Sequence, residues 1–111
     1  MCYDPTSPES IRPLKWTNPE VFYFDGDMAL IWGRYDGDPE ATMGMRWMEA
    51  EGPQGYPVSR GFPQWMVVPA RLSRYLLEGL ERDEAINEEV SQSIRNRDIL
   101  ARARARVGLN P

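Results

Sequence analysis

Hydrophobic and polar positions alternate through the middle of the chain and then change to a helical period. Four short β-prone runs, separated by turn residues, lie at 21–24, 28–35, 41–49 and 65–68. After Pro69 the apolar positions recur every three or four residues, which predicts helices over 70–81 and 83–106. The pattern therefore predicts an α+β domain: a four-stranded, mainly antiparallel sheet (a β-meander) followed by two C-terminal helices packed on it.

Two acidic triplets separate the first three runs, Asp25-Gly26-Asp27 and Asp36-Gly37-Asp38. Asp-Gly favours tight hairpin turns, whose central residues take positive φ. Turns at both triplets place them at opposite ends of one strand, about 26 Å apart at about 3.3 Å per residue. Ligands of one cation must lie within about 2.6 Å of it. The triplets therefore cannot share a cation, and we expect turns rather than a metal or cofactor site.

The turn lengths also predict which residues pair across the strands. A two-residue turn at Asp25 and Gly26 pairs Tyr23 with Met28, and a looser loop over 36–39 pairs Trp32 with Met43. Both registers agree on which residues share one face, and a register shifted by one residue would mix polar side chains into it. That face is expected to be apolar core and carries Val21, Tyr23, Met28, Leu30, Trp32, Met43, Met45 and Trp47.

The opposite face combines small and aromatic residues. Gly33 and Gly44 lie there on neighbouring strands, with Tyr35 and Arg46 beside them. Small residues in the middle of a face let another group approach the sheet closely, which suits a shallow ligand pocket. Three alternatives stay open: the chain's own helices cover this face, the glycines mark bulges, or a partner subunit covers it.

The connection over 49–65, "EAEGPQGYPVSRGFPQW", is long and rich in glycine and proline. Long loops in small domains are often functional, and this one offers aromatic and guanidinium groups to a protein or a small ligand. The alternative is a loop whose aromatic side chains pack back onto the core. The candidate ligand-binding residues are then Tyr56, Arg60, Phe62, Trp65, Gly33, Gly44, Tyr35 and Arg46.

The first predicted helix carries an apolar stripe that is expected to face the core, formed by Leu72, Tyr75, Leu76 and Leu80. The second carries a thinner stripe, formed by Ile86, Val90 and Ile94, which would bury little surface by itself. Its charges are acidic early and basic late, an order that suits the helix dipole and also an antiparallel pairing of two copies. We therefore expect a homodimer with this second stripe at its interface.

Composition bounds the remaining possibilities. The 111 residues, 41% hydrophobic and 27% charged, suit a single domain over 20–111, preceded by a proline-rich segment over 1–19 that is expected to be extended or partly disordered. A lone cysteine, no long apolar run and no basic or apolar start predict a cytoplasmic protein without membrane insertion. The net charge of −4 disfavours nucleic acid as a partner, and Arg102, Arg104 and Arg106 would splay around a helix rather than form one basic ridge.

The chain contains no histidine, which excludes imidazole bases, Ser-His-Asp triads and imidazole metal ligands. No glycine-rich phosphate-binding motif is present either. We therefore assign no catalytic residue and expect a small non-catalytic binding module, homodimeric, for a protein or a small-molecule ligand. The alternative is a small carboxylate-dependent enzyme using Glu49, Glu51 or Tyr56.

Overall fold

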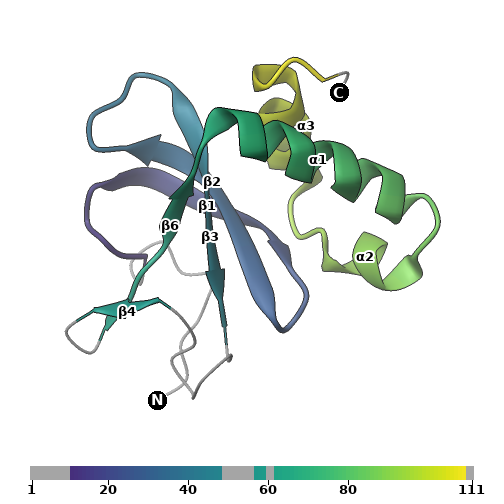
Figure 1. Ribbon diagram of the computed structural model, residues 1–111, viewed down its shortest axis with the longest axis horizontal. Coiled ribbons are helices and arrows are strands. Elements are labelled where there is room, and N and C mark those ends of the chain that lie inside the picture. The colour runs from purple at the N-terminus through teal and green to yellow at the C-terminus, as the bar shows by residue number, and fades with distance from the viewer. Residues whose placement is uncertain (1–10, 49–56, 60–61, 110–111) are drawn as a thin grey trace.

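The computed structural model describes residues 11–48, 57–59 and 62–109. Their strands are β1 (Trp16–Phe24), β2 (Met28–Tyr35), β3 (Ala41–Trp47), β4 (Val58–Ser59), β5 (Phe62–Pro63) and β6 (Met66–Val68). Their helices are α1 (Ala70–Glu84), α2 (Glu88–Ser93) and α3 (Arg97–Arg106). Strands β1, β2, β3 and β6 form one antiparallel sheet in that order, and β4 pairs with β5 (Figure 1). The α+β fold expected from the sequence is confirmed.

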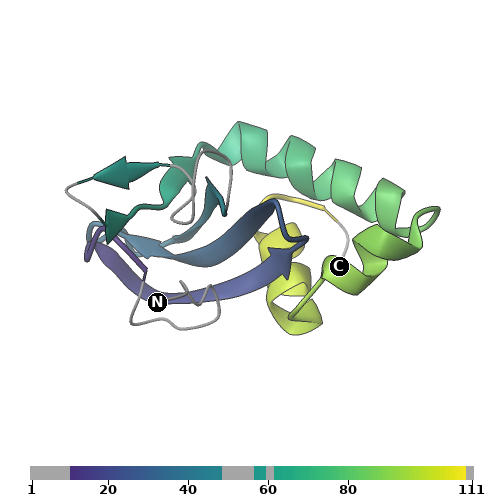
Figure 2. The same cartoon turned by 90° about the horizontal axis from the view of Figure 1, so that it is seen from below.

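The sheet has an apolar core on each side. The helices cover one face (Figure 2), where Leu77 of α1 and Ile99, Leu100 and Ala103 of α3 pack against sheet residues that include Trp32. The other core contains no helical residue among those described. It consists of Ile11, Trp16, Ala29, Ile31, Met48 and Trp65. The chain therefore covers the second face with the residues that precede and follow the three-stranded meander.

The register between β2 and β3 is as expected from the sequence, with Trp32 opposite Met43 and Leu30 opposite Met45. The expected register between β1 and β2 is wrong, because Tyr23 pairs with Leu30 instead of Met28. The first turn is shifted by one residue, to Gly26 and Asp27, since Phe24 pairs with Ala29 and the Asp25 N–H group donates to the Met28 carbonyl at 3.2 Å. The Asp25 carboxylate accepts hydrogen bonds from the backbone N–H groups of Asp27 and Met28, both at 2.9 Å. Such side-chain bonds to the following backbone define an Asx turn.

A tight turn with positive φ at both central residues lies within the second loop, over 36–39, where φ is 54° at Asp36 and 80° at Gly37. The N–H group of Asp38 closes it with a 3.1 Å bond to the Tyr35 carbonyl. Both triplets are therefore turns: the looser loop over 36–39 is as predicted, and the two-residue turn lies one residue later than predicted.

Two residues depart from the predicted core face. An irregularity between Val21 and Tyr23 shifts the pairing of β1, so Phe22 and Tyr23 both join the helix-side core and Val21 packs with the opposite one. A bulge changes the side-chain alternation in this way. Trp47, at the end of β3, is 41% exposed rather than buried.

The predicted core stripe of α1 is wrong. Leu72, Tyr75 and Leu76 are 51%, 58% and 39% exposed, whereas Ser73 and Leu77 are buried and Leu80 is partly buried against the core. The rotation of the helix is set where it leaves β6, since the Ser73 hydroxyl donates to the Val68 carbonyl at 3.2 Å. This contact turns Ser73 toward the sheet, and the more apolar neighbouring face turns outward.

The second predicted helix, over 83–106, is divided into α2 and α3. Asn87 caps α2, its side chain accepting from the N–H groups of Glu89 and Val90, and Asn96 caps α3. Between the two helices Ile94 is extended and pairs with Tyr23 at the sheet. Asparagine is a favoured N-cap residue because its side-chain oxygen satisfies the first free N–H groups of a helix.

Candidate functional site

The glycine-bearing face of the sheet is closed by the chain itself. A Cβ atom at Gly44 would lie 2.7 Å from two carbons of the Trp16 ring, and one at Gly33 would lie 2.8 Å from the Cα of Pro19. The glycines therefore admit β1 residues, neither a ligand nor a helix. The expectation of a close approach at Gly33 and Gly44 holds, but the approaching groups are Pro19 at Gly33 and Trp16 at Gly44.

Three other candidates surround this second core. The Tyr35 ring contacts the Trp16 ring edge-on, with centroids 5.0 Å apart. Trp65 is buried in the same core. Arg46 is fully buried, and its Nη1 donates to the carbonyls of Pro57 at 3.2 Å and Gln64 at 2.8 Å. These contacts give both residues a structural role, because Arg46 ties the backbone at Pro57 and Gln64 to β3 and Trp65 packs against the sheet.

The remaining candidate residues belong to the long loop. Tyr56 and Arg60 lie outside the described residues, as do Glu49 and Glu51 of the alternative enzyme site. Phe62 forms part of β5. No site can be assembled from these residues.

The structure does not bring the expected dimer stripe together. Ile86 precedes the Asn87 cap and is 82% exposed, whereas Ile94 is buried in the helix-side core and Val90 packs partly against that core. The three residues do not share one helix face, because the chain is not helical at either end of the stripe.

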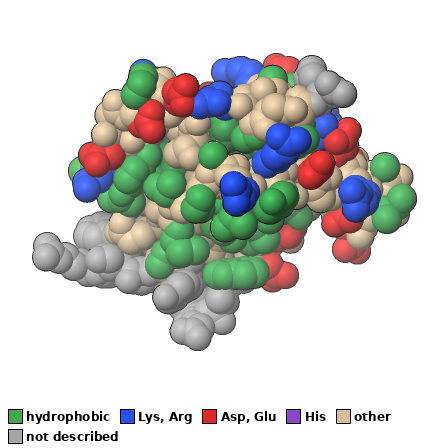
Figure 3. Space-filling model, turned by 45° about the horizontal axis from the view of Figure 1, so that its top comes forward, with side chains coloured by type: hydrophobic (Ala, Val, Ile, Leu, Met, Phe, Trp, Pro, Cys, Tyr) green, Lys and Arg blue, Asp and Glu red, His purple; other side chains and the backbone are tan. Residues whose placement is uncertain are grey.

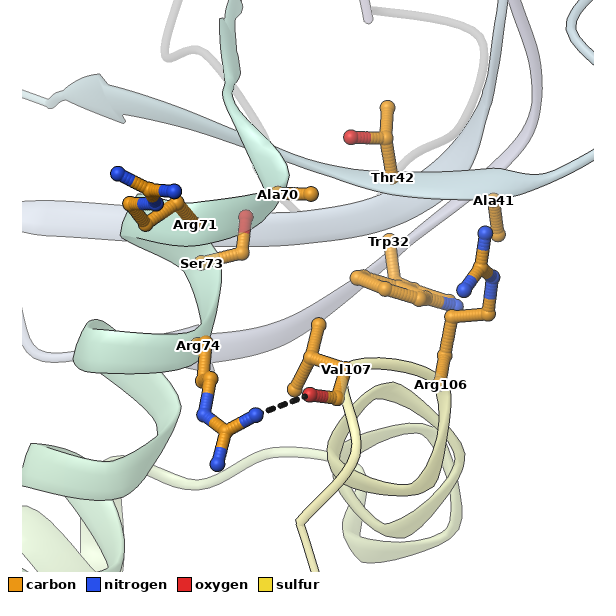
Figure 4. A pocket seen from close by; sticks show the side chains of 9 residues that line it. All are labelled: Trp32, Ala41, Thr42, Ala70, Arg71, Ser73, Arg74, Arg106 and Val107. Carbon is orange, nitrogen blue, oxygen red and sulfur yellow. Dashed lines mark hydrogen bonds between the residues drawn. The ribbon is translucent and has the colours of Figure 1, made fainter.

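A pocket of about 350 Å³ opens between the start of α1, strands β2 and β3, and the end of α3 (Figure 4). The pockets that hold small ligands in proteins span about 300–1,000 Å³, so this volume suits a small one. Its lining residues come from four segments far apart in the sequence. They are Trp32, Ala41, Thr42, Ala70, Arg71, Ser73, Arg74, Arg106 and Val107.

The pocket has an aromatic surface on the sheet side. The Trp32 ring lies between Thr42 and Val107, and the nitrogen-bearing edge of the ring points toward Arg106 (Figure 4). Two hydroxyl groups lie nearby. Both donate to the Val68 carbonyl, Ser73 at 3.2 Å and Thr42 at 3.4 Å. Since their protons are engaged, these hydroxyl oxygens offer the pocket hydrogen-bond acceptors.

Three arginines line the pocket with this surface. Arg74 Nη1 donates to the Val107 carbonyl at 3.5 Å, Arg106 forms an ion pair with Glu40, and Arg71 stands at the first turn of α1. With Glu40 counted, the pocket and its rim carry two net positive charges in a chain of net charge −4. The potential of the pocket is therefore opposite in sign to that of the whole protein.

The start of α1 adds to this positive potential. Its first turn contains no acidic residue, and its N-cap residue, Pro69, makes no side-chain capping bond. The amino end of a helix carries a partial positive charge, which acidic residues normally offset. Arginines at this end oppose the helix dipole, so an anion bound among them would relieve the repulsion.

A second pocket, of about 220 Å³, lies between α1 and α3 and is largely self-neutralised. Glu84 pairs there with Arg97, and Glu81 pairs with Arg104 at 2.5 Å. Opposite charges that already pair within the chain offer little to a ligand, and the first pocket is therefore the candidate site.

Sequence reasoning missed this site. One local feature of the sequence points to it: Arg71 and Arg74 follow Pro69 with no acidic residue between them, and their charge opposes the helix dipole. Their proximity to Arg106 depends on how α3 docks, which the local pattern does not encode. The sequence predicts Trp32 in the core, and it is indeed buried. One edge of it nevertheless lines the pocket.

Within the described residues no three or more Asp, Glu, Cys or His side chains gather into a set that could hold a metal ion. The same part of the chain contains no helix of the length and apolarity that crossing a membrane requires. Comparison of the chain with models of known families, with curated proteins and with solved structures finds no match.

Proposed function

We propose that this protein is a small non-catalytic binding module whose pocket between α1, α3 and the sheet binds a small organic anion. The observation that carries the proposal is that Arg71, Arg74 and Arg106 line one pocket together with Trp32. Arginine is the preferred side chain for carboxylate and phosphate groups, since its planar donors bind their oxygens in pairs.

The lining defines the kind of ligand. A carboxylate or phosphate group would bind the guanidinium groups, and a planar or apolar body would pack on Trp32, Ala41 and Val107. A hydroxyl or amino group on that body would donate to the Thr42 oxygen. The volume of about 350 Å³ favours a ligand with one ring.

The pocket supports binding rather than catalysis. No carboxylate, thiol or imidazole is among its lining residues, and the nearby Glu40 is engaged with Arg106. A general base needs a titratable group within hydrogen-bond reach of the substrate. The proposal keeps the expectations of a cytoplasmic location, from the single cysteine, and of a homodimer, on a different surface from the predicted one.

The test is titration of the full chain with three probes, phenyl phosphate, benzoate and the neutral benzyl alcohol, followed by tryptophan fluorescence and calorimetry. We expect the two anions to bind at concentrations up to about 10 mM and the alcohol not to bind in that range. A dissociation constant of 1 mM corresponds to a binding free energy of −4.1 kcal/mol, so binding at about 10 mM is weaker than this. In the Arg71→Gln/Arg74→Gln variant the anions should bind at least about tenfold more weakly, or about 1.4 kcal/mol.

Two substitutions, made together, serve as the matched control. Arg82→Gln and Arg102→Gln together remove the same two charges from exposed positions of α1 and α3 outside the pocket. They should change the affinity less than about twofold, because exposed charges away from the ligand are screened at physiological salt. Equal losses in the control and in the pocket variant, or no anion binding at 10 mM, contradict the proposal.

A further inference from the structure

The outward face of α1 is apolar and uncovered. Leu72, Tyr75 and Leu76 are exposed large side chains, spaced as one stripe with Gly79 seven residues after Leu72. In Figures 1 and 2, α1 lies on the outside of the helix layer, and no other described segment covers its outer side. Figure 3 shows hydrophobic side chains exposed among charged ones on one face of the molecule. Apolar patches of this kind on small proteins often mark association surfaces.

We infer that two copies of the chain associate through this face, with their α1 helices antiparallel about a twofold axis between Tyr75 and Leu76. Such an axis places Leu72 of each copy opposite Gly79 of the other. A Cβ atom at Gly79 would meet no atom within 4 Å, so the space above this glycine is open to a leucine side chain. The stripe is therefore complementary to itself, as a twofold interface requires.

The charges of α1 select the antiparallel orientation. Its first half carries Arg71 and Arg74 without an acidic residue. Its second half carries five charged residues with a net charge of −3, namely Glu78, Glu81, Arg82, Asp83 and Glu84. An antiparallel pair sets each basic half against an acidic half, whereas a parallel pair sets like charges together. The dipoles of the two helices favour the same orientation.

The stripe itself does not line the anion pocket, although Arg71 belongs to both surfaces. Ser73 and Arg74, which line the pocket, lie on the side of α1 opposite the stripe, since successive helical residues are about 100° apart. Association through the stripe therefore leaves the Ser73 and Arg74 side of the pocket open, and the Leu76→Asp variant should bind the anions as the wild type does, so failure of the dimer is distinguishable from failure of anion binding.

Sedimentation equilibrium of the full chain tests the inference. We expect a species of twice the 12.8 kDa chain mass at about 100 µM, the weak end of ordinary association. Leu76→Asp should weaken the association at least tenfold, because it places a charge at the centre of the stripe. Ile86→Asp, the same kind of change at an exposed apolar residue outside the stripe, should have no effect.

Gly79→Ala separates association from folding. Alanine favours the helix over glycine, so this variant should unfold at a higher temperature than the wild type when both are dilute, yet associate several-fold more weakly because the added methyl fills the space for Leu72. Loss of association by misfolding would instead lower the unfolding temperature.

Charge reversal tests the orientation. Glu78→Arg should weaken the dimer, and the double variant Arg71→Glu/Glu78→Arg should restore it, since only an antiparallel pair sets residue 71 near residue 78 of the other copy. A monomer at 100 µM, a dimer unaffected by Leu76→Asp, or an equal loss with Ile86→Asp overturns the inference. Failure of the double variant to restore association overturns the antiparallel arrangement.

Discussion

The indole ring of Trp16 lies directly over Gly44, across the intervening strand β2. Two ring carbons are 2.7 Å from the point that a Cβ atom of residue 44 would occupy. Glycine is thus required at position 44 by the close packing of a side chain, not by backbone conformation, and the same contact closes the face that the sequence offered as a pocket.

Gly44→Ala should lower the free energy of unfolding by about 1–3 kcal/mol, the usual cost of inserting a methyl group into a packed core. The added Cβ would also lie 2.8 Å from Cγ1 of Ile31, so moving the Trp16 ring alone does not relieve the overlap. Urea unfolding measures the change.

Gly79→Ala is the matched control for this substitution. Position 79 is open and helical, so the same added methyl should raise the free energy of unfolding of the monomer by up to about 1 kcal/mol. If both variants changed stability in the same direction, the contact between Trp16 and Gly44 would not be the cause.

Arg46→Leu should destabilise the fold without affecting anion binding. The substitution removes the hydrogen bonds from Nη1 to the carbonyls of Pro57 and Gln64. The Pro57 carbonyl keeps the Gln64 N–H group as a donor at 2.9 Å, and hydrogen bonds made by a charged group contribute about 1.5–3 kcal/mol. Chemical unfolding should report this loss, and the affinity for phenyl phosphate at the Arg71 pocket should stay within about twofold of the wild type, or 0.4 kcal/mol. A stable variant that no longer binds the probe would show that Arg46 is a ligand-binding residue.

The two tryptophans of the predicted core face should differ in their energetic contribution. Trp32 is buried and Trp47 is 41% exposed, so Trp32→Ala should cost about 3–5 kcal/mol. Trp47→Ala should cost about 1 kcal/mol or less, since much of its surface stays in water. Thermal and urea unfolding of both variants, compared with the wild type, check the prediction; equal losses would mean that Trp47 is buried.

Stability should fall at high pH partly because of Tyr23. Burial of the phenol, and next its 2.9 Å hydrogen bond to Asp25, raise the pKa of Tyr23 from 10.0 to about 12. Because the folded state holds this proton more tightly than the unfolded state, the stabilisation is complete below pH 10 and is lost as the pH rises toward 12.

Unfolding by urea between pH 8 and 12 should therefore show a shallower decline for Tyr23→Phe than for the wild type. The difference in tyrosinate absorbance between the two proteins gives the titration of Tyr23 itself. A midpoint near the ordinary tyrosine pKa of about 10 would show that the phenol is not protected.

The sequence by itself determined the class of fold, the turns at the two acidic triplets and the pairing of β2 with β3. These features depend on local chemistry: strict alternation requires one register, and Asp-Gly forms turns in any context. The N-caps at Asn87 and Asn96 also depend on local chemistry, so the division of the second predicted helix into α2 and α3 was predictable from the sequence.

Only the tertiary structure decided which apolar face of α1 is buried and what fills the space above Gly44. The stripe containing Leu72 and Leu76 is at least as apolar as the buried face, but the contact of Ser73 with Val68 turns the other face to the sheet. The pocket likewise exists because α3 docks its Arg106 beside residues 30 or more positions earlier. Such convergence depends on how distant segments pack, since no local preference records which side chains will meet.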